Sequence, residues 1–318
     1  MASAAPAPPV PDAPPEAVCI ICLDRGDEPL HRNCACRGPT AGFAHMSCLV
    51  RYVASAAETN PMRWYDCGTC KQRYFGATQL GLARARWERA RGLPEEDNER
   101  LAAMNCLALA LTDSRDYAAA LPLFEQGLQI ERRINGDLHP ATLASIYNLS
   151  DTHLQMGNPR LALPLAEECL RGRRQTLGEE HDRTLTALGN LSDAHLDMRN
   201  YDEALPLARR ALEGQRRTLG NEHVDTLVSI SRLAFILARM GDKEAAPPLY
   251  EEEMRLSRRT RGSEHPDTLR SIVNVGKLYC ELERHGEGLP LLRECVAGMR
   301  KVHGEGHPDT QGAIRALA

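Results

Sequence analysis

A repeat of 42 residues in the second half of the chain constrains its fold more than any other feature. Glycine, threonine, proline and histidine each recur five times at this spacing, the histidines being His139, His181, His223, His265 and His307. Each copy holds two stretches with apolar residues at helical spacing, separated by a turn such as 156–159. One pair of helices cannot bury its apolar faces alone, whereas stacked copies can. The pattern predicts a mainly α protein in which residues 98–318 form a superhelix of repeats.

The composition agrees with helices and excludes several functions. Aromatic residues make up only 4% of the chain, which disfavours a β-sandwich or barrel. A net charge of −4 excludes a strongly basic nucleic-acid binder and a polybasic membrane-surface protein. No segment reaches about 18 consecutive apolar residues. We therefore expect no nucleic-acid partner, no membrane partner and a place in the cytoplasm, with the nucleus left open.

Local composition divides the chain ahead of the repeats. Six prolines in the first fifteen positions predict that residues 1–16 are a disordered lead. Most of the cysteines lie in 17–76, which predicts a separate metal-binding module there. Residues 77–97 are expected to be a helical linker, with Trp87 packed against the segment before it or after it.

Seven of the 11 cysteines and one histidine form four close pairs within the module. Thiolate and imidazole are preferred zinc ligands, and eight of them suffice for two closed tetrahedral sites. In a chain with no secretion signal, such a cluster indicates metal rather than disulfides. The sequence therefore predicts two structural Zn²⁺ ions held by Cys19, Cys22, Cys34, Cys36, His45, Cys48, Cys67 and Cys70.

The order of these ligands resembles that of the RING-CH zinc finger family. Four cysteines are followed by one histidine and three cysteines, with a single residue between the third and fourth ligands. The chain departs from the family in having eight residues before His45, where seven are common, and Tyr52, where tryptophan is common. The resemblance implies interleaved sites, one formed by Cys19, Cys22, His45 and Cys48 and the other by Cys34, Cys36, Cys67 and Cys70.

The same resemblance implies a ubiquitin ligase that forms no covalent intermediate. Such a module docks a ubiquitin-conjugating enzyme charged with ubiquitin and orients the thioester for attack by a lysine, which is catalysis by orientation. We therefore expect no catalytic nucleophile or general base in this chain. The positions that correspond to the docking surface are Ile20, Tyr52, Gly68, Thr69 and Lys71.

The repeats resemble the tetratricopeptide repeats of kinesin light chains, most closely at residues 265–268. That resemblance implies a groove, lined by the first helix of each copy, for a protein or peptide substrate. A polar column in the middle of the first helices would face this groove and bind a peptide backbone; its members are Asn148, Asn190, Arg232 and Asn274. The alternative for this column is hydrogen bonding between helices inside the stack. The histidine column is expected to cap helices rather than to bind metal.

Two further interpretations of the module remain open. In the first, the chain is a non-enzymatic scaffold whose zinc module caps the repeats or binds a protein. In the second, the module is a PHD-type chromatin reader, which has the same ligand order and would need an aromatic cage built from Phe43, Tyr65 or Tyr74. Exposure of Ile20 together with Lys71 on one surface would favour the ligase.

Overall fold

The computed structural model describes residues 17–32, 43–68, 73–74, 76–306 and 308–317. The chain divides into two compact units, residues 1–136 and 137–318. This division falls within the repeat region, after its first pair of helices. The disordered lead predicted for residues 1–16 lies outside the described residues.

The first unit begins with a small module around a two-stranded sheet. Strands β1 (Leu30–Arg32) and β2 (Phe43–His45) pair antiparallel, and helix α1 (Met46–Ala57) follows directly. A 3-10 turn, η2 (Pro61–Trp64), starts where the Asn60 side chain accepts a hydrogen bond from the Met62 amide. Leu49, Val53 and Trp64 are buried at the centre of the module. Because this core is small, it supplies little stability by itself.

Three helices complete the first unit: α2 (Gly76–Ala90), α3 (Asn98–Asp113) and α4 (Tyr117–Asn135). Leu82 of α2 is fully buried in the core of the small module, and α2 also packs along α3. Asp97 caps α3 by accepting hydrogen bonds from the amides of Glu99 and Arg100. Helix α2 therefore joins the module to the first helical pair of the repeats.

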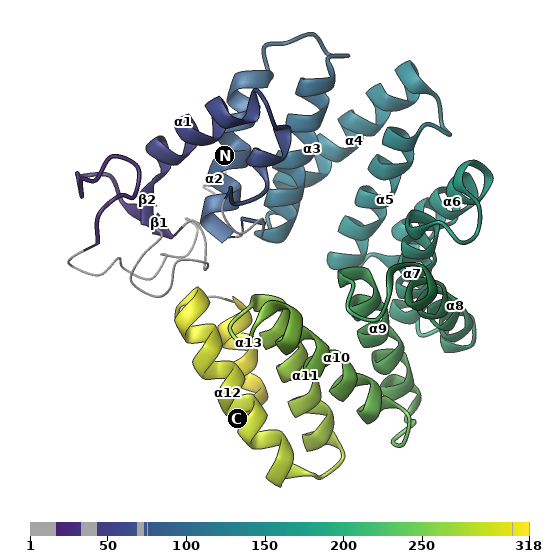
Figure 1. The fold of residues 1–318 in the computed structure, drawn as a ribbon. Coiled ribbons are helices and arrows are strands. Elements are labelled where there is room, and N and C mark those ends of the chain that lie inside the picture. The colour runs from purple at the N-terminus through teal and green to yellow at the C-terminus, as the bar shows by residue number, and fades with distance from the viewer. Residues whose placement is uncertain (1–16, 33–42, 69–72, 75, 307, 318) are drawn as a thin grey trace. The chain divides into compact units, whose positions relative to one another are not determined.

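The second unit is a stack of antiparallel helix pairs, each of which contacts the next (Figure 1). Within this unit the first helices of successive pairs also contact one another, as α5 does with α7 and α7 with α9. Its helices are α5 (Pro140–Gln155), α6 (Pro159–Leu177), α7 (Asp182–Asp197), α8 (Tyr201–Leu219), α9 (Val224–Met240), α10 (Ala246–Arg261), α11 (Pro266–Glu281), α12 (His285–His303) and α13 (Pro308–Leu317). The mainly α fold with a small N-terminal Cys/His module is confirmed. No described helix is long and apolar enough to cross a membrane.

The histidine column caps the first helices, as predicted. In each of four repeats the histidine Nδ1 accepts a hydrogen bond from the amide two residues later, at 3.1–3.3 Å. The residue is the N-cap in all four cases, and the four are His139, His181, His223 and His265. His307 lies outside the described residues.

Acid is expected to weaken the cap at His265. Burial lowers the pKa of this imidazole below its ordinary 6.5, although Asp267 acts in the opposite direction and Arg261 and Arg270 reinforce the shift. The unfolded chain then takes up the proton first, so the stability from the neutral cap is full above pH 6.5 and is lost as pH falls below it. Asparagine at position 265 keeps a capping oxygen and does not titrate, so His265→Asn should lose less stability between pH 7 and pH 5 than the wild type, measured by urea unfolding at both pH values. Exposed His285, changed in the same way, is the control and should leave the dependence intact.

Candidate metal centre and partner-binding surfaces

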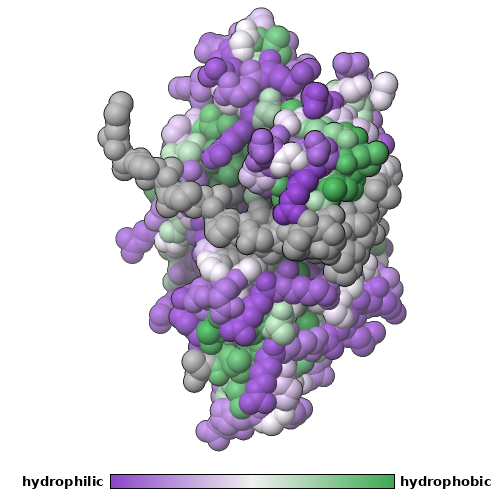
Figure 2. All heavy atoms as spheres, turned by 90° about the vertical axis from the view of Figure 1, so that its left-hand side faces the viewer, coloured by the Kyte–Doolittle hydropathy of each residue, from purple (hydrophilic) through white to green (hydrophobic). Residues whose placement is uncertain are grey.

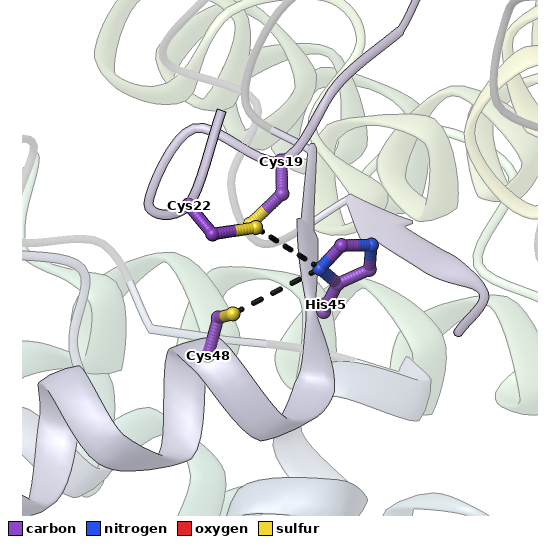
Figure 3. Close-up of side chains that lie close together, drawn as sticks. All are labelled: Cys19, Cys22, His45 and Cys48. Carbon is purple, nitrogen blue, oxygen red and sulfur yellow. Dashed lines mark hydrogen bonds between the residues drawn. The ribbon is translucent and has the colours of Figure 1, made fainter. Parts of the chain in front are cut away.

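Four predicted ligands come together at one end of the small sheet. The ligand atoms of Cys19, Cys22, His45 and Cys48 all lie within 4.8 Å of one another (Figure 3). Nδ1 of His45 is 3.4 Å from Sγ of Cys22 and 3.8 Å from Sγ of Cys48. Tetrahedral zinc, with Zn–S of about 2.3 Å and Zn–N of about 2.0–2.1 Å, separates such atoms by about 3.5 Å. The donor set and its spacing therefore fit a zinc ion.

Local structure explains how these side chains converge. The amide of Leu23 donates to the carbonyl of Cys19, which closes a tight turn and turns both cysteines of the first pair inward. Leu23 takes a left-handed conformation (φ 63°) at the end of this turn. His45 ends β2 and is the N-cap of α1, so Cys48 falls in the first turn of that helix. Three elements thus deliver one or two ligands each.

The hydrogen bonds of His45 fix which nitrogen faces the cysteines. Nε2 lies 2.6 Å from the carbonyl of Arg25, which can only accept, so Nε2 carries the proton. Nδ1 is then left with its lone pair toward the sulfur atoms, as a metal ligand requires. A side chain on Gly26 would crowd the imidazole, because its Cβ would stand 3.3 Å from the ring.

The thiols of Cys19 and Cys48 sit in surroundings that favour ligation. The pKa of the Cys22 thiol is raised instead, because its hydrogen bond with the Asp24 backbone is outweighed by desolvation and by the other two thiols. Burial raises the pKa of the Cys19 thiol, but backbone hydrogen bonds outweigh burial and hold that pKa below its ordinary value. A guanidinium nitrogen of Arg51 lies 3.6 Å from Sγ of Cys48, and this hydrogen bond helps to lower the Cys48 pKa against burial. Zinc binds the thiolate form, so both effects assist it.

Of the other four predicted ligands, only Cys67 lies within the described residues. Cys67 is buried, 7% exposed, in the core of the module. Cys34, Cys36 and Cys70 lie outside the described residues. The second zinc site therefore stays a prediction.

Among the predicted docking positions that the structure describes, Tyr52 is exposed and Ile20 is partly buried. Tyr52 is 50% exposed, and a Cβ on Gly68 would stand 3.3 Å from its hydroxyl, so these two positions are neighbours. Ile20 is partly buried against the core of the module, whereas Ile21 is 39% exposed. Thr69 and Lys71 lie outside the described residues. Sequence reasoning missed Ile21, because only the fold shows which of two adjacent isoleucines faces outward.

Several large apolar side chains of the module are exposed at its surface. On the side of the molecule drawn in Figure 2, hydrophobic residues reach the surface between hydrophilic ones. The large hydrophobic side chains exposed on the described part of the module are Val18, Ile21, Leu23, Tyr52 and Met62. An aromatic cage is not formed by the three candidate residues, because Phe43 and Tyr74 are buried and the Tyr65 hydroxyl accepts a hydrogen bond from Arg86.

The polar column of the repeats divides between a groove and the interior. Arg232 and Asn274 line a groove of about 390 Å³ within the second unit. Asn190 is only 2% exposed, and its amide lies 2.8 Å from the hydroxyl of Ser150 in the preceding repeat. Asn148 is half-buried. The structure therefore places two members at the groove, while Asn190 adopts the alternative, a contact between helices.

Arg232 is held in the groove by the preceding repeat. Its guanidinium forms two hydrogen bonds, of 2.7 and 2.8 Å, with the carboxylate of Asp193 on α7. A Cβ at Gly189 would collide with this guanidinium, so the glycine leaves room for it. The charge of Arg232 is thereby compensated before any partner binds.

Comparison with known families identifies both parts of the chain. The family model of the tetratricopeptide repeat matches four overlapping stretches, 99–175, 162–217, 183–255 and 225–301, which together span more than half of the chain. The chain belongs to the tetratricopeptide repeat family. The model of the RING-variant domain matches residues 19–70, so a RING-variant domain precedes the repeats. No curated protein matches the chain.

Solved structures support the same fold. One solved structure contains TPR-like repeats of a putative kinesin light chain from Podosopora anserina, repeats that are nearly identical to one another. Its sequence is 26% identical to this chain, with a TM-score of 0.51 over 66% of this chain and 98% of that one. BtubC from P. vanneervenii is 18% identical, with a TM-score of 0.56 over 72% and 92%. A Rap protein complexed with competence and sporulation factor is 7% identical, with a TM-score of 0.61 over 86% of each chain. The predicted resemblance to a RING-type finger and kinesin-light-chain repeats is confirmed.

Proposed function

We propose that this chain is a RING-type ubiquitin ligase that binds a charged ubiquitin-conjugating enzyme through its RING-variant domain and selects protein substrates through its repeats. The observation that carries the proposal is the arrangement around the metal cluster. The turn between Cys19 and Cys22 holds Ile21 outward, and α1 presents Tyr52 beside Gly68. Exposed apolar and aromatic side chains on a rigid support are the usual anchors of a protein interface.

Two zinc ions would make that support rigid. The first would be held by Cys19, Cys22, His45 and Cys48, and the second by Cys34, Cys36, Cys67 and Cys70. Both sites would be closed by four protein ligands, so the metal would supply folding energy and no reactive water. We assign the module to residues 17–76, the linker to 77–97 and the repeats to 98–318, and we place the protein in the cytoplasm.

The chemistry would take place on the bound enzyme. A lysine ε-amine of the substrate attacks the thioester carbonyl, an isopeptide bond forms, and the cysteine thiolate of the conjugating enzyme leaves. Ile21 and Tyr52 would hold the charged enzyme, Thr69 and Lys71 would be further docking positions, and the repeats would bring the lysine near. Orientation of this kind supplies rate without a nucleophile from this chain.

Autoubiquitination tests this proposal most simply. The full chain, loaded with zinc and mixed with a panel of charged conjugating enzymes, is expected to form ubiquitin ladders. Replacing exposed Ile21 by alanine should reduce the rate about tenfold or more, because it removes an interface anchor. The same change at half-buried Ile20 is the matched control and should leave most of the activity. Equal rates for wild type and the Ile21 variant, at equal zinc content, would contradict the docking face.

A non-enzymatic scaffold is the alternative function, and one contact favours it. Arg86 of α2 is 3% exposed and hydrogen-bonds both Glu99 of α3 and the Tyr65 hydroxyl of the module. The RING-variant domain is thus built onto the first helical pair, as a cap on the repeats would be. Absence of ladders with every conjugating enzyme, from a folded and fully metallated chain, would establish this alternative.

A further inference from the structure

Helix α10 departs from all the other second helices at one buried position. Where α4, α6, α8 and α12 carry glycine, cysteine or alanine (Gly127, Cys169, Ala211 and Cys295), α10 carries Glu253. Three residues later, glycines of α6, α8 and α12 receive a leucine from the preceding first helix, as Gly172 receives Leu143. Helices α4 and α10 have Ile130 and Leu256 at this position instead of glycine. Residues of α9, α10 and α11 line the groove described above.

The carboxylate of Glu253 is buried and only half satisfied. The residue is 5% exposed, and its Oε1 accepts hydrogen bonds from the hydroxyls of Ser257 (2.8 Å) and Ser271 (2.7 Å). Oε2 is buried and has no hydrogen-bond partner among the described residues. Burial raises the pKa of this carboxyl, although both serines and Arg261 act against the shift. A buried acceptor without a donor costs stability, and the other second helices carry no carboxylate at this position.

The charges around Glu253 are already matched with one another. Arg232 is paired with Asp193, and both Arg261 and Arg270 form ion pairs with Asp267. No described cation forms an ion pair with Glu253 among the groove-lining residues. The missing partner of Oε2 must therefore donate a hydrogen bond, and a cationic donor would also neutralise the carboxylate.

Exposed apolar side chains form part of the groove that Glu253 lines. Val228 and Phe235 of α9 line the same groove and are 49% and 46% exposed. A lysine has a long methylene stem that covers apolar surface and a compact ammonium at its end. Arginine fits less well, because its planar fork seeks two carboxylate oxygens and Oε1 is already engaged by the serines.

We propose that this groove binds an extended peptide through a lysine side chain, whose ammonium donates to Oε2 of Glu253 while its stem lies against Val228 and Phe235. The inference rests on the proposed role of the repeats in selecting partners and names the chemistry that they select. Glu253 is then a specificity residue, which explains why a buried carboxyl stands where other repeats carry a small side chain, at a cost in stability.

A random-peptide display library, selected on the zinc-loaded full chain, tests this assignment. Peptides enriched on the wild type should share one lysine position, and acetylation of that lysine in a synthetic copy should weaken binding at least tenfold. Glu253→Gln keeps the shape and removes the charge, so it should lose the same factor. Exposed Glu244→Gln is the matched control and should bind as the wild type does.

Stability measurements separate recognition from a structural role. If Glu253 serves a ligand, Glu253→Ala, which restores the small side chain found in α8, should unfold at the same urea concentration as the wild type or a higher one. A clearly lower midpoint would show that the carboxylate holds the repeats together and would overturn the proposal. Enriched peptides without lysine would overturn it while leaving the groove a partner site. If no peptide is enriched at all, both the recognition of lysine and the role of the groove as a partner site are overturned.

Discussion

Replacing His45 by alanine, or stripping zinc with a strong chelator, is expected to unfold the RING-variant domain and leave the repeat helices folded. The core of the domain is small, and a structural zinc site supplies about 10–16 kcal/mol of folding energy. Without the metal, the buried thiols of Cys19 and Cys48 lose the partner that their clustering requires. The expected loss therefore exceeds the stability of any domain of this size.

Tryptophan fluorescence reports this unfolding selectively. The chain has two tryptophans, Trp64 and Trp87, and both belong to the first unit. Trp64 is 7% exposed, so unfolding should shift its emission to longer wavelength, while the helical circular dichroism of the repeats persists. His31→Ala, a change at a half-buried histidine in β1 outside the cluster, is the control. An unchanged emission spectrum after complete removal of zinc would contradict the metal centre.

Removal of Glu99 is expected to destabilise the first unit by about 3 kcal/mol, since it leaves a buried guanidinium without its counter-ion. Arg86 forms two hydrogen bonds with Glu99, of 2.9 and 2.8 Å, and a third of 2.8 Å with the Tyr65 hydroxyl. Burial acts against the charged form, yet the bonds to Glu99 hold the pKa of Arg86 above its ordinary value. Urea unfolding of Glu99→Ala, followed by tryptophan fluorescence, measures the effect.

The two partners of this pair are not equivalent. The side chain of Arg86 is 3% exposed and that of Glu99 is 49% exposed. Arg86→Met should therefore cost less than Glu99→Ala, because it leaves the remaining charge near water and fills the space with an apolar chain. Glu88, whose exposed pair with Arg91 is worth little, provides the matched control. Equal losses for Glu99→Ala and Glu88→Ala would show that Arg86 does not depend on its partner.

The repeat architecture was predictable because its signals are local and recur. A histidine that caps a helix accepts a hydrogen bond from an amide only two residues away. The recurrence of histidine every 42 residues was therefore enough to predict where the first helices begin. The convergence of Cys19, Cys22, His45 and Cys48 rested instead on resemblance, since spacing alone leaves the pairing of four ligand pairs open.

Residues whose role depends on a distant neighbour could not be predicted in the same way. Asn190 shares a column with Arg232, yet it meets Ser150 inside the stack while Arg232 meets Asp193 at the groove. The linker was expected to pack through Trp87, and the structure adds Arg86, a charged residue that sequence patterns assign to solvent. Glu253 is visible as an exception in its column, but only the fold shows that its Oε2 is buried without a donor.

Single-turnover discharge of ubiquitin from a charged conjugating enzyme to free lysine isolates the activity proposed for the RING-variant domain. The assay needs neither a substrate nor the groove, so it reports only on the RING-variant domain. We expect that the zinc-loaded chain accelerates discharge, that Ile21→Ala removes at least about nine-tenths of the acceleration, and that Ile20→Ala retains most of it. No acceleration by a fully metallated chain with any conjugating enzyme, or the opposite order of the two variants, would contradict this proposal.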